Sequence, residues 1–154
     1  VIPFGNGAER VLENHDIKAH IINLEFNRHG KDHLYRAALE GIAFSFVYGM
    51  EVMKEMGMPV NTMKVGNDNL FQSAVFAETI ANTLGCEIEM IDTTGAVGAA
   101  KAAGIGAGIY SSYQEAFKNT KIVHTYRAGE NRKIYDRAYQ KWKTVMEGIL
   151  KNKH

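Results

Sequence analysis

The hydrophobic pattern is clearest between residues 32 and 56, where apolar side chains recur at three- and four-residue steps. That spacing places them on one face of an α-helix. Asp32 is a suitable N-cap and Gly57 a suitable residue just past the last turn, so the sequence predicts a helix from Asp32 to Met56. The apolar positions are Leu34, Ala38, Ile42, Phe46, Met50 and Met53.

A second face of this helix carries only small residues, at Ala38, Gly41, Ser45 and Gly49. A glycine inside a helix costs roughly 0.5–1 kcal/mol relative to alanine. Two of them therefore need a packing reason, because small residues let another backbone approach closely. We expect tight contact between this face and a sheet or a neighbouring helix.

The next stretch alternates strands with helices. Its pattern predicts strands at Thr62–Val65 and Glu87–Ile91, with helices at Leu70–Leu84 and Gly95–Gly108. Such alternation is typical of an α/β fold with parallel neighbouring strands and right-handed crossovers. The glycine-rich run that opens the last helix matches neither a P-loop nor a dinucleotide fingerprint, so close packing explains it best.

The remaining segments are simpler. Ile22, Leu24 and Phe26 mark a short extended segment, and residues 113–117 a short helical piece. From Arg132 to Leu150 the chain is amphipathic, with aromatic and aliphatic residues on one side and Lys and Arg on the other. No linker or repeat divides the chain, so residues 1–154 are expected to form a single domain.

Composition and charge narrow the function classes. The chain of 154 residues carries 18 Lys and Arg against 17 Asp and Glu, a net charge of +1. This balance gives no electrostatic argument for a nucleic acid or an anionic membrane as a partner. It has no apolar run long enough to span a lipid bilayer. Because Cys86 is the only cysteine, a reduced, cytoplasmic setting is expected.

Candidate chemistry is sought first in the loops after Val65 and Ile91, because ligands of open α/β sheets bind at the carboxyl ends of the strands. Asn69, with Gln72 three residues later, could cap the first helix, and Thr93 or Thr94 the second. Two helix N-termini facing one side suit a phosphate or a nucleotide. Ordinary helix capping is the alternative reading, and it stays open at this point.

Neither a catalytic set nor a metal site can be assigned from spacing. His29 and His33 have helical spacing, but no third ligand is evident. The residues alone therefore lead to an α/β domain with a candidate nucleotide or phosphate site.

Separate segments resemble, in order along the chain, the C-terminal domain of FGGY-type carbohydrate kinases, especially xylulokinases. Residues 35–44, read as Tyr-Arg-Ala-Ala-Leu-Glu-Gly-Ile-Ala-Phe, are similar to the Arg-Ala-x-x-Glu-Gly-x-x-Phe helix of that family and are the most specific match. Residues 4–10 resemble its Gly-Glu-Arg loop, residues 94–100 its Gly-Ala-x-Gly-Ala-Ala run, and residues 135–139 its tyrosine-rich final helix.

The resemblance implies an actin-like, ribonuclease H-like ATPase domain, incomplete at its N-terminal strands. Residues 1–154 would be the C-terminal nucleotide-binding domain of a carbohydrate kinase whose N-terminal sugar-binding domain is absent. In the family, a Gly-Gly-Gly-Ala-x-Ser loop lies against the adenosine. The corresponding residues are Gly66, Asn67, Asp68, Asn69 and Ser73, and replacing the glycine triplet brings hydrogen-bonding side chains to that surface.

The resemblance also implies an activity. The full-length protein would use ATP with Mg²⁺ to phosphorylate a ketopentose, with D-xylulose as the expected sugar. The catalytic Asp and the phosphate loops of the family fall outside this chain, so the isolated chain is expected to be inactive. An open sheet edge would favour pairing with a second copy, as a homodimer. The alternative is a non-catalytic nucleotide-binding or assembly module.

Overall fold

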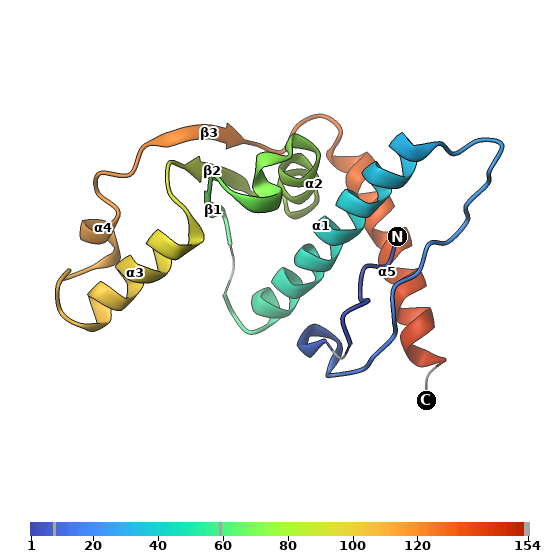
Figure 1. The fold of residues 1–154 in the computed structure, drawn as a ribbon, viewed down its shortest axis with the longest axis horizontal. Coiled ribbons are helices and arrows are strands. Elements are labelled where there is room, and N and C mark those ends of the chain that lie inside the picture. The colour runs from blue at the N-terminus through green and yellow to red at the C-terminus, as the bar shows by residue number, and fades with distance from the viewer. Residues whose placement is uncertain (8, 59, 153–154) are drawn as a thin grey trace.

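The computed structural model describes residues 1–7, 9–58 and 60–152. Figure 1 shows the arrangement of the helices and strands. In chain order they are η1 (Arg10–Leu12), α1 (Lys31–Glu55), β1 (Thr62–Gly66), η2 (Asn69–Gln72), α2 (Ala74–Leu84), β2 (Glu87–Ile91), α3 (Gly95–Gly106), α4 (Tyr113–Ala116), β3 (Ile122–Tyr126) and α5 (Arg132–Lys151).

The sheet has three strands in the order β1-β2-β3. Strands β1 and β2 are parallel, in a register that runs from Thr62 opposite Glu87 to Gly66 opposite Ile91. Helix α2 connects them, which confirms the predicted β-α-β unit. Strand β3 pairs antiparallel with β2, with an irregularity between Met90 and Ile91. No strand was predicted there, and the described residues place no other strand beside β1.

The hydrophobic core lies where α1, α2 and α5 pack together with the N-terminal segment. Its centre is aromatic: the Phe44 ring lies 5.6 Å from that of Tyr139 and 6.0 Å from that of Trp142, measured between centroids. The Phe4 ring also joins this cluster, with its centroid 6.3 Å from that of Trp142. Helices α3 and α4 lie at the opposite end of the molecule (Figure 1).

The ends of α1 correct one prediction and agree with another. The N-cap is Gly30, because the helix begins at Lys31, and Asp32 lies within the first turn. There the negative charge of the Asp32 carboxylate interacts favourably with the positive end of the helix dipole, but Asp32 is not the capping residue. The Gly30 N–H donates to Nδ1 of His33 over 3.2 Å. Gly57 follows the last turn with a left-handed φ of +82°, as predicted.

The helix predicted from Leu70 is two elements. A 3-10 turn at Asn69–Gln72 comes first, and α2 begins at Ala74 with Ser73 as its N-cap. The backbone of Asn69 is left-handed, with φ of 51°, so Asn69 does not cap a helix. Instead of completing a capping box, the Gln72 side-chain amide donates to the Asn67 carbonyl oxygen over 3.3 Å.

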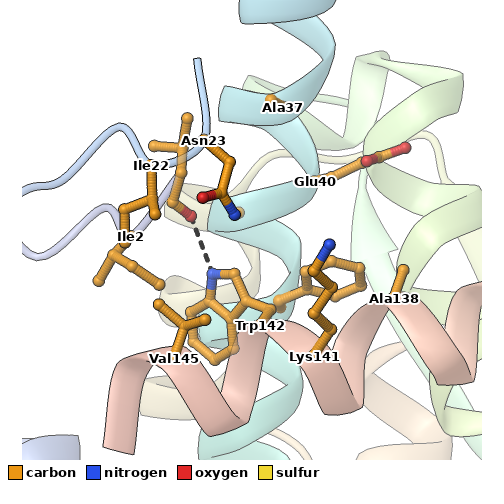
Figure 2. A pocket seen from close by; sticks show the side chains of 12 residues that line it. Ile2, Ile22, Asn23, Ala37, Glu40, Ala138, Lys141, Trp142 and Val145 are labelled. Atoms are coloured by element: carbon orange, nitrogen blue, oxygen red, sulfur yellow. Dashed lines mark hydrogen bonds between the residues drawn. The ribbon is translucent and has the colours of Figure 1, made fainter. Parts of the chain in front are cut away.

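The small-residue face of α1 packs against the N-terminal segment, whereas we expected a sheet or a helix. A Cβ at Gly41 would collide with the carbonyl oxygen of Val1, and Gly49 faces a methyl group of Val11. The Val1 oxygen also accepts a hydrogen bond of 2.8 Å from Nε1 of Trp142 (Figure 2). Glycine is therefore required at position 41 for close backbone approach.

Residues 22–26, expected to be a short extended segment, lie outside the helices and strands, and the side chain of Phe26 is 90% exposed. One further expectation is wrong. Helix α3 is not closely packed, since Gly104 is its only buried residue and it ends at Gly106. The cause is the position of α3 away from the core (Figure 1), and most of its residues are exposed. Among the described residues, no helix is long and apolar enough to cross a membrane.

Candidate functional site

The loops that follow β1 and β2 lie side by side, because the carboxyl ends of two parallel strands meet at one edge of the sheet. Their backbones are joined directly. The Asn67 N–H donates to the carbonyl oxygens of both Ile91 and Thr93, at 3.1 and 3.0 Å. The two loops that the sequence singled out therefore form one surface.

Asp68 adds a side-chain link between the loops. Its Oδ2 accepts a hydrogen bond of 3.0 Å from the N–H of Gly95, the first residue of α3, which is 27 positions further along the chain. Thr94 caps the same helix, with its hydroxyl oxygen accepting from the Val97 N–H over 3.4 Å. A carboxylate and a hydroxyl thus pair the N–H groups of Gly95 and Val97 at the N-terminus of α3.

This arrangement corrects the expectation of two free helix N-termini facing one phosphate. The carboxylate of Asp68 already stands at the positive end of α3, where it would repel a second anion. Helix α2 is separated from β1 by η2, so its N-terminus does not follow the strand directly. The surface is better suited to an uncharged part of a ligand than to phosphate.

Gly66 is needed for the close contact between the loops. A Cβ at this position would lie 2.8 Å from the Thr93 carbonyl oxygen and 2.9 Å from Oδ1 of Asp68. Both distances are shorter than a real side chain tolerates, so any larger residue would push the loops apart. This glycine therefore shapes the surface without contributing a functional group.

The other three predicted residues offer polar groups to a ligand. The side chains of Asn67 and Asn69 are exposed, and Ser73 is half-buried at the start of α2. Their amide and hydroxyl groups make no hydrogen bond within residues 1–7, 9–58 and 60–152. Amides can donate and accept, which matches the hydrogen-bonding groups of a nucleoside.

The loop lies between two hollows. One, of about 420 Å³, is lined by Gly66, Asp68, Asn69 and the aromatic rings of Phe71 and Phe76, among others. The other, of about 750 Å³, lies toward α3 and α4.

Sequence reasoning did not select several residues that line this second hollow. They include Lys64, Tyr113, Phe117 and Lys118. Thr93 also lines it, and its hydroxyl oxygen is buried without a partner in the part of the chain that the structure describes. Only Lys64 had a sequence signal, since strand alternation places it on the face opposite the buried Met63.

A smaller hollow of about 270 Å³ lies beside the aromatic core, next to Val1 and Trp142 (Figure 2). Glu40 and Lys141 line its rim, but the rest of its lining is mainly apolar.

Near the core, burial and the neighbouring Glu51 carboxylate raise the pKa of Tyr139. Over the described residues, no group of three side chains could hold a metal ion.

The sequence matches a model of the FGGY family of carbohydrate kinases, C-terminal domain, over residues 1–107. A relative from Escherichia coli strain K12, the L-xylulose/3-keto-L-gulonate kinase, is 29% identical over 125 residues. That alignment covers 79% of this chain and 25% of the relative. The chain therefore spans about a quarter of the length of the curated relatives it matches.

Solved structures share the fold. A xylulose kinase from Rhodospirillum rubrum has a TM-score of 0.69 and 22% identity, covering 86% of this chain and 27% of that one. A glycerol kinase from Plasmodium falciparum, solved with ADP, has a TM-score of 0.73 and 20% identity, covering 97% and 30%. The three-stranded sheet and its helices are thus part of an actin-like ATPase fold.

The expected family is confirmed, because the family model covers more than half of the 154 residues. The chain belongs to the FGGY family of carbohydrate kinases.

Proposed function

We propose that residues 1–154 form the C-terminal nucleotide-binding domain of an ATP-dependent sugar kinase. In this proposal Gly66, Asn67, Asp68, Asn69 and Ser73 provide the adenosine side of the nucleotide site. The observation that carries it is the joined surface after β1 and β2, where exposed amides lie at the carboxyl ends of two parallel strands in a chain of this family. A glycerol kinase of the same fold was solved with ADP.

The geometry favours different binding places for the nucleoside and for the phosphates of the nucleotide. The amides of Asn67 and Asn69 and the Ser73 hydroxyl can hydrogen-bond the base or ribose, which are uncharged. The phosphates lie elsewhere in the proposal, because the α3 N-terminus is occupied by Asp68. Mg²⁺ bound to the phosphates of ATP would supply charge neutralisation during phosphoryl transfer.

The chain's own contribution is binding and orientation. A base that accepts the proton of the sugar hydroxyl, and donors that hold the transferring phosphoryl group, are also needed for transfer. We place both in the part of the full-length enzyme beyond this chain. The isolated chain is accordingly expected to bind nucleotide and to transfer no phosphate.

Binding of ADP tests the proposal directly. Calorimetric titration of the full-length protein should give a saturable heat. Asn69→Gly, which keeps the left-handed backbone, and Ser73→Ala should each weaken binding about fivefold to tenfold, the usual effect of one lost hydrogen bond. Asn131→Ala, on an exposed residue before α5, is the matched control and should bind as the unmodified protein does. An unmodified protein that binds no nucleotide would refute the proposal.

We propose a ketopentose, D-xylulose, as the sugar substrate. The support is the likeness to xylulokinases in the sequence motifs and to a xylulose kinase in the fold. An L-xylulose kinase and a glycerol kinase are also among the similar proteins. Assay of the full-length protein with D-xylulose, L-xylulose, D-ribulose, glycerol and D-gluconate discriminates these: the highest kcat/KM is expected for D-xylulose, and a preference for glycerol would overturn it.

The alternative role is a non-catalytic nucleotide-binding or assembly module. It is favoured by the absence of the family's glycine triplet from the loop after β1, because the Asp68 carboxylate in this loop accepts a hydrogen bond from α3. Tight ADP binding without phosphorylation of any sugar in the panel would support this role.

We also propose a homodimer in the cytoplasm. The outer edge of β1, unpaired among the described residues, supports self-association, and the single buried Cys86 supports a reduced compartment. Light scattering of the isolated chain that shows only monomer at high concentration would argue against the dimer.

A further inference from the structure

The side-chain hydrogen bond that joins the two loops of the candidate site is the one between Asp68 and helix α3. We propose that Asp68 is a positioning residue: its carboxylate fixes the nucleotide loop, residues 66–69, against the start of α3 and does not itself touch the nucleotide. This inference rests on the proposed nucleotide site and assigns separate roles within it.

Both oxygens of the Asp68 carboxylate face the neighbouring structure. Oδ2 accepts from the Gly95 N–H over 3.0 Å. Oδ1 lies close to the backbone of Gly66, at 2.9 Å from where a Cβ would be. The side chain is half-buried, unlike the exposed side chains of Asn67 and Asn69. Oδ2 is therefore committed to a hydrogen bond within the protein, and Oδ1 lies against the Gly66 backbone.

The helix end makes this contact stronger than one between neutral groups. A carboxylate at a helix N-terminus interacts favourably with the dipole, and a charged acceptor shortens and strengthens an N–H hydrogen bond. The contact also ties together residues that are 27 positions apart, so it restrains the loop more than a local turn would.

The loop has few other ties to its surroundings. Asn69 holds a left-handed conformation, with φ of 51°, which asparagine adopts more readily than most residues other than glycine, so this turn needs no outside support. Apart from Asp68, the loop is tied to its surroundings by the Asn67 N–H and by the Gln72 side chain. Without the carboxylate, the amides of Asn67 and Asn69 would sample several positions, and ordering them would weaken nucleotide binding.

The test compares Asp68→Ala, Asp68→Asn and Asp136→Ala in the full-length protein. Asn keeps an oxygen that can accept from Gly95, whereas Ala keeps none. Asp136, exposed on α5, is the matched carboxylate control. Affinities for ADP, 2′-deoxy-ADP and 3′-deoxy-ADP are measured by calorimetry, and exchange of the Gly95 amide hydrogen is measured without nucleotide.

Asp68→Ala should weaken all three nucleotides by the same factor, about tenfold, because the lost contact is not with the ligand. Asp68→Asn should recover most of this loss, and Asp136→Ala should show none. Exchange of the Gly95 amide should be faster in Asp68→Ala even without nucleotide. In steady-state kinetics, KM for ATP should rise while kcat stays within about twofold.

Two results would overturn the inference. A loss that is smaller for one deoxy analogue than for ADP would show that the carboxylate bonds to a ribose hydroxyl. Unchanged affinities in Asp68→Ala would show that the loop does not depend on it. If the unmodified protein binds none of the nucleotides, the proposed function itself is wrong, and the inference falls with it.

Discussion

A single methyl group added at Gly41 tests how the N-terminal segment packs on α1. The new Cβ would lie 3.2 Å from the carbonyl carbon of Val1 and 3.4 Å from its Cβ, and closer still to the carbonyl oxygen. Alanine is better than glycine in a helix by roughly 0.5–1 kcal/mol. Overpacking a buried site costs about 1–3 kcal/mol, and here a backbone has to shift. We expect Gly41→Ala to lower the free energy of unfolding by about 1–2 kcal/mol.

Urea denaturation measures this change, and the only tryptophan of the chain provides the signal, since Nε1 of Trp142 bonds to the same Val1 oxygen. Gly148→Ala is the matched control. It lies in α5 with nothing within 4 Å of its added Cβ, so it should raise the free energy of unfolding by about 0.5–1 kcal/mol. If both variants are stabilised equally, Val1 does not pack against Gly41 and the reasoning is refuted.

Three further changes probe the core and the site. Trp142→Phe removes the hydrogen bond to Val1 and should lower the free energy of unfolding by about 1–3 kcal/mol in urea. Because this variant has no tryptophan, unfolding of both proteins is followed by circular dichroism, and no change would show that the bond contributes nothing. Burial raises the pKa of Tyr139, so its stabilising contribution is present below the unfolded pKa of about 10 and is lost as pH rises above that value. Tyr139→Phe should therefore reduce the fall of the urea midpoint between about pH 9 and 11. An unchanged slope would contradict this. Gly66→Ala should weaken ADP binding about tenfold or more, because the added Cβ would lie 2.8 Å from the Thr93 carbonyl oxygen. The thermal midpoint of this variant should stay within about 3 °C of the parent, which would show that only the loop moved.

Long periodic segments were predictable from the sequence. Helices α1 and α5 have strong apolar faces, and the structure places both close to their predicted ranges. The parallel pairing of β1 and β2 also followed from the pattern, because a strand, a helix and a strand of these lengths form a right-handed crossover. Local propensity and tertiary packing agree in these elements.

The sequence did not reveal strand β3. Residues 122–124 are all exposed, so the segment lacks the alternation of a half-buried strand. Its conformation comes from pairing with β2, for example Ile88 opposite Tyr126. Likewise, asparagine is a residue type preferred at helix N-caps, but the turn after β1 holds Asn69 in a left-handed conformation. Both depend on partners distant in sequence.

The location of the candidate site was predictable, and its internal contacts were not. Any ligand of a parallel sheet is sought at the carboxyl edge, so the loops after β1 and β2 could be selected from the order of elements alone. The bond between Asp68 and Gly95 depends on how closely the loops approach, and that distance is set by the absence of a side chain at Gly66. A pattern of residue types contains no such distance.

The uneven distribution of the core has a consequence for how the molecule opens. Helices α1, α2 and α5 each bury several apolar side chains, whereas α3 buries only Gly104. Segments with few buried contacts unfold locally at a lower free energy than the rest of a protein. Backbone amides of α3 and α4 should therefore exchange with solvent hydrogens before those of α1. The Asp68 contact then joins the nucleotide loop to the half of the molecule that loosens first.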